Sequence, residues 1–318
     1  MSHRQHGIAL ITAMLVTTLA AIAAAAVLVS ANNGIRRAST LIDGERAWWY
    51  AQGLESWTRR ILAHDLEKNG AVDSLDEDWA QPLDYLPVEQ GAVRGQIIDL
   101  TGRFNLNNLA STQAVKYQKQ LLLLFQNIKD LDPAAAQPLA VAIIDWIDTN
   151  QIPGGAGGAE DPDYQSLPLP YRAANQPMAS PTELLAIKGM TPEIYRRIAP
   201  FVCTLPLVGG KTATKINVNT ASAEVLMSLS ATVDRDKIGN FITKRLKEPA
   251  KTVQELQQPS PNDTLPADVT PDMVDVRSQY FLMTAEALIG SGRAALYSVI
   301  QRAASGAPQV IARSLDTE

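Results

Sequence analysis

Residues 1–37 read MSHRQHGIALITAMLVTTLAAIAAAAVLVSANNGIRR. This stretch limits the folds that the chain can adopt. The run from Ile8 to Ala31 contains no charged residue and is rich in Ala, Leu, Ile and Val. At about 1.5 Å of rise per residue, a helix of this length crosses a hydrocarbon core about 30 Å thick. The polar triplet Asn32-Asn33-Gly34 ends the run. The sequence therefore predicts an N-terminal helix that a membrane can hold.

The junction before this run is open to three interpretations. An ordinary signal peptide would be cut near residues 23–26, where small alanines supply a cleavage site. A signal anchor would keep the whole segment. A prepilin leader would be cut on the polar side, because the short leader MSHRQHG ends in Gly7 and meets Ile8 abruptly. In the last two cases the apolar helix stays on the mature chain.

The bulk composition is that of a globular chain. Its 318 residues suffice for a sizeable core and about two domains, with 46% apolar and 19% charged residues. The net charge of -5 makes it a poor general binder of nucleic acid. Cys203 is the only cysteine, so no intrachain disulfide can form, and its apolar neighbours predict a buried core residue.

The residues give no positive sign of an enzyme. Histidines occur only at His3, His6 and His64, and a chain cut after Gly7 would keep only the last. A multi-histidine zinc site is then excluded, and one candidate base remains for a Ser-His-Asp arrangement. No G-x-S-x-G, H-E-x-x-H or Walker motif is present. A carboxylate-pair glycosidase stays open only because carboxylates are plentiful, and we expect no catalytic activity.

The segment after the apolar run is predicted to be helical. Residues 35–69 contain no Pro, and their apolar residues recur at roughly helical spacing. The helix could continue the membrane span as one long rod, although three glycines interrupt the stretch. We expect the aromatic trio Trp48, Trp49 and Trp57 to pack in the core.

Strands are predicted near both ends of the soluble part, with helices between them. The strands cover 92–100, 104–106, 279–288 and 293–302, and the helices cover 113–147, 181–202 and 221–229. Gly290-Ser291-Gly292 is typical of a hairpin turn between the last two strands. Loops are expected at 70–90, 149–170 and 247–272, and after Ser305. The simplest architecture is α+β: a long N-terminal helix on a small antiparallel sheet, with a helical domain inserted in the sheet's sequence.

A set of short stretches resembles one known family. They are HGIALITAMLV (6–16), WWYAQGLES (48–56), GRFNLNNL (102–109), WIDTNQ (146–151), YRAANQPM (171–178), ELLAIKGM (183–190), FVCTLPL (201–207) and KINVNTAS (215–222). In order and spacing the set is similar to the minor pseudopilin K family of type II secretion systems, also called general secretion pathway protein K. Single stretches are weak signals, but the set is specific and spans nearly the whole chain.

The resemblance implies a type IV pilin-like fold with a large inserted all-helical domain. Its parts would be a prepilin leader at 1–7, a transmembrane helix at 8–31, a pilin-like helix with the first strands at 32–107, the insertion with its acidic loop at 108–275, and closing strands at 276–318. The chain would be a single-pass protein of the bacterial inner membrane, with its soluble domain in the periplasm.

The resemblance also implies how the chain would work. Prepilin peptidase would cut between Gly7 and Ile8, and the new N-terminus would be methylated. The subunit would join minor pseudopilins I and J at the pseudopilus tip, and would meet other pseudopilins and inner-membrane components of the secretion system. It would thereby support protein export across the outer membrane.

The fifth position of the chain that this cut would leave is Thr12. Most pilin-like subunits carry Glu there, and its carboxylate is thought to pair with a neighbour's N-terminal amine. An unpaired carboxylate is costly in lipid. A subunit at the end of the filament that lacks a neighbouring amine would therefore be more stable with an uncharged residue at this position. The alternative is that Thr12 is a tolerated small residue in a membrane helix.

An acidic loop is a candidate calcium site. Acidic and amide residues lie around the glycine-rich stretch 154–158, and calcium binds six to eight oxygens. The loop is not an EF-hand, because Pro153 and Ala159 stand where that loop needs Gly and Glu. The residues alone leave a solvated loop open. The resemblance implies structural calcium, with Glu160, Asp161, Asp163, Asp148, Asn150 and Asn175 as its candidate ligands.

A membrane-anchored DNA-binding protein is the alternative function. Residues 184–202 and 216–229 both resemble helix-hairpin-helix segments, which present backbone N–H groups to phosphate through a Gly-x-Gly turn. Gly189 is present, but Thr191 occupies the place of the second glycine, and the second copy lacks the turn. Because the chain is acidic overall, we expect these hairpins to serve packing or partner contact and not nucleic acid.

Overall fold

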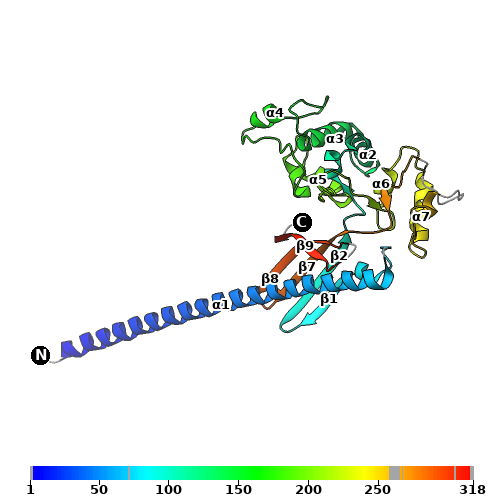
Figure 1. The fold of residues 1–318 in the computed structure, drawn as a ribbon. Helices are drawn as coiled ribbons and strands as arrows, with labels where there is room; N and C mark the ends of the chain where they lie inside the picture. The colour runs from blue at the N-terminus through cyan, green and yellow to red at the C-terminus, as the bar shows by residue number, and fades with distance from the viewer. Residues whose placement is uncertain (1–2, 71, 258–265, 267, 304–305, 316–318) are drawn as a thin grey trace.

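The computed structural model describes residues 3–70, 72–257, 266, 268–303 and 306–315. Figure 1 shows one long helix, a sheet lying against the half of it that is farther from the N-terminus, and a mostly helical part beyond the sheet. The N-terminal half of the long helix projects away from the rest of the molecule. The predicted α+β architecture is confirmed.

Helix α1 spans His3–Asn69 without a break, so the predicted rod is confirmed. Its 67 residues make it about 100 Å long. One face lies on the sheet through buried residues at helical spacing: Ala47, Ala51, Leu54 and Leu62. The two alanines let the helix axis approach the strands closely. From Ile8 to Ile42 every residue is exposed, and the first buried one is Asp43.

The sheet is antiparallel and has five strands in the order β1-β2-β7-β8-β9. The strands are β1 Leu83–Val88, β2 Gly91–Asp99, β7 Tyr280–Ile289, β8 Gly292–Gln301 and β9 Gln309–Leu315. The predicted loop at 70–90 and the predicted irregular tail are wrong where they cover β1 and β9. Both are edge strands with mostly exposed residues, so neither has the alternation of apolar and polar residues by which half-buried strands are recognised.

The β7–β8 hairpin meets α1 where the helix first becomes buried. Asp43 accepts hydrogen bonds from the Ser291 backbone N–H and hydroxyl, both at 3.0 Å. A Cβ on Gly290 would lie 2.5 Å from the Asp43 carboxylate, and one on Gly292 would overlap the Asp43 backbone. The predicted glycine turn is confirmed, and these glycines allow the hairpin to touch the helix.

Strands β2 and β7 are neighbours in the sheet, yet 180 residues of chain separate Asp99 from Tyr280. That chain forms a second core of its own. Its helices are α2 Ala114–Asn127, α3 Pro133–Ile147, α4 Asp161–Gln165, α5 Pro192–Ile198, α6 Ala223–Met227 and α7 Arg235–Arg245. The 3-10 turns are η2 Leu106–Ala110, η3 Pro181–Ala186, η4 Ala199–Phe201 and η5 Glu255–Gln257, and η1 Asp78–Ala80 precedes the insertion. The predicted helical stretch at 113–147 is two helices, α2 and α3, and Asp132 caps the second by accepting the Ala134 N–H.

Two parallel pairs of two-residue strands close the insertion: β3 Phe104–Asn105 with β4 Val202–Cys203, and β5 Ile216–Asn217 with β6 Val274–Asp275. Buried asparagines reinforce these junctions. The Asn105 side-chain amide donates to the Leu205 carbonyl at 3.1 Å, and that of Asn107 donates to the Met178 carbonyl at 2.9 Å. Because each asparagine pairs backbone groups that would otherwise be buried alone, the GRFNLNNL stretch acts as structural support.

The insertion also contacts the face of the sheet that α1 leaves free. Cys203 and Leu205 pack there with Tyr280 and Leu282. Cys203 is buried as predicted, and its thiol donates to the Leu100 carbonyl at 3.3 Å.

The prediction that the aromatic trio packs in the core is wrong for two of its members. Trp48 is half-buried against the sheet, but Trp49 is 67% exposed and Trp57 is 47% exposed. The reason is the helical period, because the buried face recurs at 47, 51, 54 and 62, and both of these indoles fall on another side of the helix.

Candidate functional site

The apolar part of α1 is long enough and apolar enough to cross a membrane. An 18-residue window has a mean hydropathy of 2.3, and none of it is buried inside the fold. Within the described residues, nothing packs against this half of the helix. The helix from Ile8 to Ile42, about 50 Å long, is exposed, and its apolar part from Ile8 to Ala31 is therefore left for lipid or other helices to cover.

Thr12 is already satisfied within the helix. Its hydroxyl donates toward the Ile8 and Ala9 carbonyls at 3.1 and 3.0 Å. The side chain thus brings no unpaired polar group into an apolar surrounding. Gly7 and Ile8 both lie inside α1, while residues 1–2 of the predicted leader lie outside the described residues.

Glu160 is the residue of the acidic loop that most needs a partner. It is fully buried at the start of α4, and neither carboxylate oxygen has a hydrogen-bond partner among the described residues. Burial, together with Asp145 and the other carboxylates of the loop, raises the pKa of Glu160 to about 7. A buried carboxylate without a donor is costly, so this position suits a bound cation.

Asp145 also lies at the acidic loop, although no motif in the sequence marks it. It is buried on α3, and its carboxylate accepts the Gly154 N–H at 3.1 Å and the Ala159 N–H at 2.9 Å. A Cβ on Gly158 would lie 2.5 Å from the same carboxylate, so the loop must be glycine-rich to wrap it. Burial raises the pKa of Asp145. In the sequence, Asp145 is a lone carboxylate within the apolar stretch 139–147, and this position was the signal that it is buried.

The other predicted ligands differ in how free they are. Asp163 pairs with Lys188 at 2.8 Å, and Asp161 accepts the Ala173 N–H at 3.0 Å. Asp148 and Asn150 bond to each other in an exposed turn, the Asn150 amide donating to Asp148 at 2.7 Å. These four side chains therefore have protein partners.

Asn175 lies in the segment after α4 and is joined to the C-terminal end of α3. Its side-chain oxygen is buried and has no hydrogen-bond partner among the described residues. Its backbone adopts a positive φ of 48°, and its N–H donates to the Trp146 carbonyl at 2.9 Å. Asn tolerates this left-handed conformation better than most residues. Glu160 and Asn175 are thus the two predicted ligands whose oxygens remain without a protein donor.

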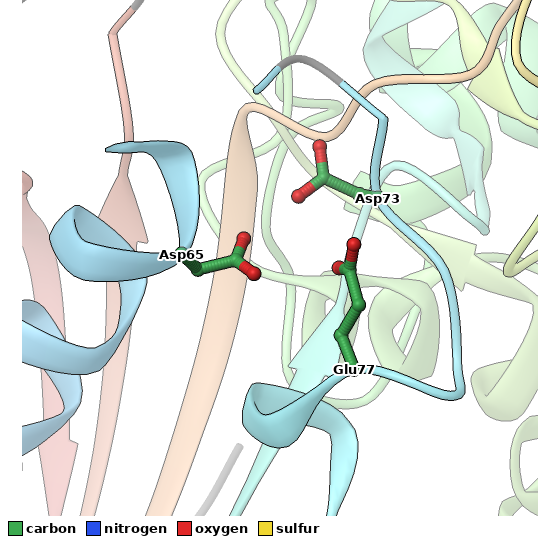
Figure 2. Close-up of side chains that lie close together, drawn as sticks. All are labelled: Asp65, Asp73 and Glu77. Atoms are coloured by element: carbon green, nitrogen blue, oxygen red, sulfur yellow. The ribbon is translucent and has the colours of Figure 1, made fainter. Parts of the chain in front are cut away.

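A different acidic cluster lies where α1 ends. Asp65, Asp73 and Glu77 offer carboxylate oxygens within 4.8 Å of one another, which no other acidic or histidine triple does in the described part of the chain. Figure 2 shows the three carboxylates pointing toward one another from α1 and from the segment after it. Arg302, which directly follows β8, forms buried ion pairs with Asp65 at 2.8 Å and with Asp73.

The pKa values in this cluster reflect its burial. Desolvation raises the pKa of Asp73 to about 6 and that of Glu77 to about 7, and the neighbouring carboxylates add to both. The Trp79 indole N–H donates to Glu77 at 2.5 Å. Arg302 and these hydrogen bonds join α1, the sheet and the following loop, so the cluster has a structural explanation as a junction.

The basic residues of the first hairpin resembling helix-hairpin-helix are engaged in ion pairs. Lys188 pairs with Asp163, Arg196 with Glu193 at 3.1 Å, and Arg197 with Asp130 at 3.6 Å. Thr191 caps α5 by accepting the Ile194 N–H. The side chains that would meet phosphate are therefore already neutralised within the chain.

These features define a class of protein. A single long helix lies across an antiparallel sheet, its N-terminal half is bare and apolar, and a large helical insertion lies beyond the sheet. This is the arrangement of a pilin-like subunit anchored by its N-terminal helix.

Comparison with known proteins gives a consistent family. Models described as "Type II secretion system (T2SS), protein K" match residues 102–207 and 216–277. The type II secretion system protein K of Aeromonas hydrophila is 33% identical over 317 residues, covering 94% of this chain and 93% of that protein. That of Pseudomonas aeruginosa is 32% identical over 324 residues, covering 99% and 94%.

A solved structure agrees. A chain from the crystal structure of the GspK-GspI-GspJ complex of the enterotoxigenic Escherichia coli type 2 secretion system is similar with a TM-score of 0.74 and 25% identity. The match covers 89% of this chain and 100% of that one. The chain therefore belongs to the type II secretion system protein K family.

Proposed function

We propose that the chain is a minor pseudopilin that caps the pseudopilus tip, in a complex with minor pseudopilins I and J. The observation that carries this proposal is the shape of the molecule: a bare apolar rod at one end and a bulky insertion beyond the sheet at the other. The rod suits packing among sister helices, whereas an insertion of this size is hard to bury along a filament. The solved relative comes from a complex with I and J subunits.

In this proposal the chain acts by assembly and not by catalysis. The helix at 8–31 spans the inner membrane, and the soluble domain stands in the periplasm. Prepilin peptidase cuts between Gly7 and Ile8, and the new N-terminus is methylated. Other pseudopilins and inner-membrane components of the system would meet the same rod. Thr12, whose hydroxyl is satisfied internally, leaves no carboxylate without a partner at a terminal position.

We further propose that the acidic loop holds structural calcium. Its support is the pair of oxygen-bearing groups without a protein donor, Glu160 and Asn175, with Asp145 adjoining Glu160. Hard oxygens of this kind suit Ca²⁺. Asp148, Asn150, Asp161 and Asp163 could complete the set by exchanging their present partners. The ion would offset the charge of the clustered carboxylates and order the glycine-rich loop.

N-terminal sequencing of the protein from its native membranes tests the proposed processing. We expect a mature chain that begins at residue 8, and a chain that keeps residues 1–7 when prepilin peptidase is absent. A mature chain beginning beyond residue 26 would mean signal-peptide cleavage and would overturn the proposal.

Co-expression tests the proposed assembly. When the full chain is expressed with the I and J subunits of its own system, we expect all three to co-purify from membranes. Gel shift of duplex DNA at varied salt addresses the alternative function, and tight, salt-dependent DNA binding would favour it.

A further inference from the structure

Arg245 is a buried cation at the end of α7, and its side chain is only 5% exposed. Its guanidinium donates to the Val218 carbonyl and, at 2.6 Å, to the Ala221 carbonyl. Its Nε has no hydrogen-bond partner among the described residues, and no carboxylate of that part of the chain pairs with it. Burial lowers the pKa of Arg245 to about 10, so the group is still charged near pH 7.

The charge of Arg245 is not offset in the way that buried charges usually are. The similarly buried Arg302 pairs with two carboxylates, Asp65 and Asp73, and a buried ion without such a partner is costly. The two backbone carbonyls on Arg245 supply partial charges only. Within the described residues, the positive charge of Arg245 is therefore left for a ligand to offset.

Arg245 lines a pocket of about 570 Å³ that α7 forms with the segment leading to η5. Phe241 and Leu256 contribute apolar walls, and the other charged residues of the lining are Lys244, Lys247, Glu248, Lys251 and Glu255. The pocket thus carries four basic and two acidic side chains, in a chain whose net charge is -5. Glu255 already accepts the Lys251 N–H at 3.0 Å. The pocket is therefore a local concentration of positive charge with a buried guanidinium in its wall.

This charge pattern selects the chemistry of the ligand. The two surplus positive charges match a dianion, and a phosphate monoester carries about -1.5 to -2 at pH 7 with three acceptor oxygens. The guanidinium fork and the point charges of lysines are the usual partners of phosphate. A phosphodiester of nucleic acid carries a single negative charge, so it fits this pocket less well.

The pocket is separate from the acidic loop. In Figure 1, α7 lies at the side of the insertion opposite α4, where the candidate calcium ligands gather. A cation at the acidic loop and an anion at this pocket would therefore bind independently of each other.

We propose that this pocket binds the phosphate group of a phosphomonoester, with Arg245 in its wall and the exposed Lys247 and Lys251 at its mouth. The ligand is free phosphate or a sugar phosphate, or else a lipid whose headgroup ends in the same group. The inference goes beyond the proposed assembly with I and J and does not depend on it. Its test uses this chain by itself, so either proposal can fail without the other.

Titration calorimetry of the full chain in a nonionic detergent with inorganic phosphate tests the site. The double variant Lys247→Gln/Lys251→Gln is expected to weaken binding at least about tenfold, because each lysine contributes a charged hydrogen bond. Arg235→Gln/Lys237→Gln removes the same charge from exposed positions of α7 outside the pocket and should leave the affinity unchanged. Equal affinities of the two double variants would overturn the proposal, as would no binding of phosphate up to about 10 mM.

Arg245→Gln should abolish binding, but it also takes donors from two carbonyls and so should lower stability. The two lysines therefore carry the test independently of folding.

Two further ligands check the chemistry. Dimethyl phosphate, a monoanionic diester, should bind at least about tenfold more weakly than inorganic phosphate, and equal or tighter binding would contradict a monoester site. Dihexanoyl phosphatidic acid presents the monoester on a lipid. If the lysine double variant weakens its binding and it binds more tightly than inorganic phosphate, the source is a lipid headgroup. If it binds no more tightly, the site serves free phosphate or a sugar phosphate.

Discussion

At the scale of single residues, the buried carboxylates of this chain fall into two kinds. Glu55 is buried, but Arg313 binds it through two contacts of 2.7 Å, and this pairing lowers its pKa. Glu160 is equally buried and has no donor among the described residues, and its pKa is raised. The Glu55–Arg313 pair joins β9 to α1, whereas the charge of Glu160 is left for a bound ion to offset.

Calcium should therefore stabilise the chain through Glu160. On adding saturating Ca²⁺ we expect the melting temperature of the purified chain to rise by about 5 °C, since ligand at 100 times its Kd adds about 2.7 kcal/mol. Glu160→Gln should lose most of that rise, and the exposed, surface-paired Glu193→Gln should keep it. Differential scanning calorimetry with and without chelator measures both, and a full calcium shift in Glu160→Gln would contradict the ligand assignment.

Glu77 should make stability depend on pH. Its folded pKa of about 7 lies above the ordinary 4.5, so the folded chain binds this proton more tightly than the unfolded chain. The stabilisation is therefore complete below about pH 4.5 and is lost as the pH rises through about 7. Glu77→Gln, which keeps an acceptor for the Trp79 indole, should reduce the fall in unfolding free energy over this range by on the order of 1 kcal/mol.

Urea titrations of the two chains across that pH range provide the measurement for Glu77. Carboxylates with lowered pKa values, such as Glu55 and Glu286, change stability in the opposite direction, but they are common to both chains. The difference between the two pH profiles is therefore the informative quantity, and identical profiles would refute the assignment.

At the scale of elements, the position of the rod on the sheet depends on one close contact. The β7–β8 hairpin touches α1 at Asp43 through Ser291, with Gly290 and Gly292 on either side. The Ser291 hydroxyl also donates to the Thr40 hydroxyl at 3.3 Å, and every residue from Ile8 to Ile42 is exposed. The hairpin thus decides where the supported part of the rod begins.

Gly292→Ala should loosen this contact. The added methyl group would overlap the Asp43 backbone, which is not free to move as a side-chain tip would be. We expect a loss of about 1–3 kcal/mol in unfolding free energy. Gly239→Ala, which meets nothing within 4 Å in α7, should be neutral or stabilising by about 0.5–1 kcal/mol. Equal stabilities of the two variants in urea titration would show that the hairpin does not seat on α1 in this way.

At the scale of the whole molecule, the exposed N-terminal half of α1 is separate from the folded cores. No residue from Ile8 to Ile42 is buried, and the cores of the sheet and of the insertion draw on later residues. The rod is therefore supported by the fold at one end and available to other molecules at the other.

A chain that lacks residues 1–35 should keep the fold. Because the removed part contributes no buried surface to either core, its melting temperature should stay within about 2 °C of that of the full chain. It should also remain in solution without detergent, which the full chain needs for its apolar helix. Calorimetry and size-exclusion chromatography check both points, and an unfolded or aggregated product would mean that the N-terminal half supports the fold.

The features of this protein that depend on local pattern can be predicted from the amino-acid sequence. The charge-free run at 8–31 predicts the helix, and β2 follows from its alternation of apolar and polar residues. The apolar segments on either side of Gly290-Ser291-Gly292 predict the β7–β8 hairpin. The short stretches, such as GRFNLNNL and KINVNTAS, also indicate the family without the tertiary structure. Each of these features is written within a few neighbouring residues, where helical or strand periodicity is enough to detect it.

The other features depend on contacts between segments that lie far apart in the sequence. No local pattern predicts the edge strand β9. Its Arg313 binds Glu55 of α1, which lies 258 residues away in the sequence. The role of Asp145 in the acidic loop, and the exposure of Trp49 and Trp57, depend on which face of a helix the sheet or the loop covers. The physical reason is that burial and pairing arise from contacts between distant segments, and one helix period offers several faces that the sequence alone does not rank.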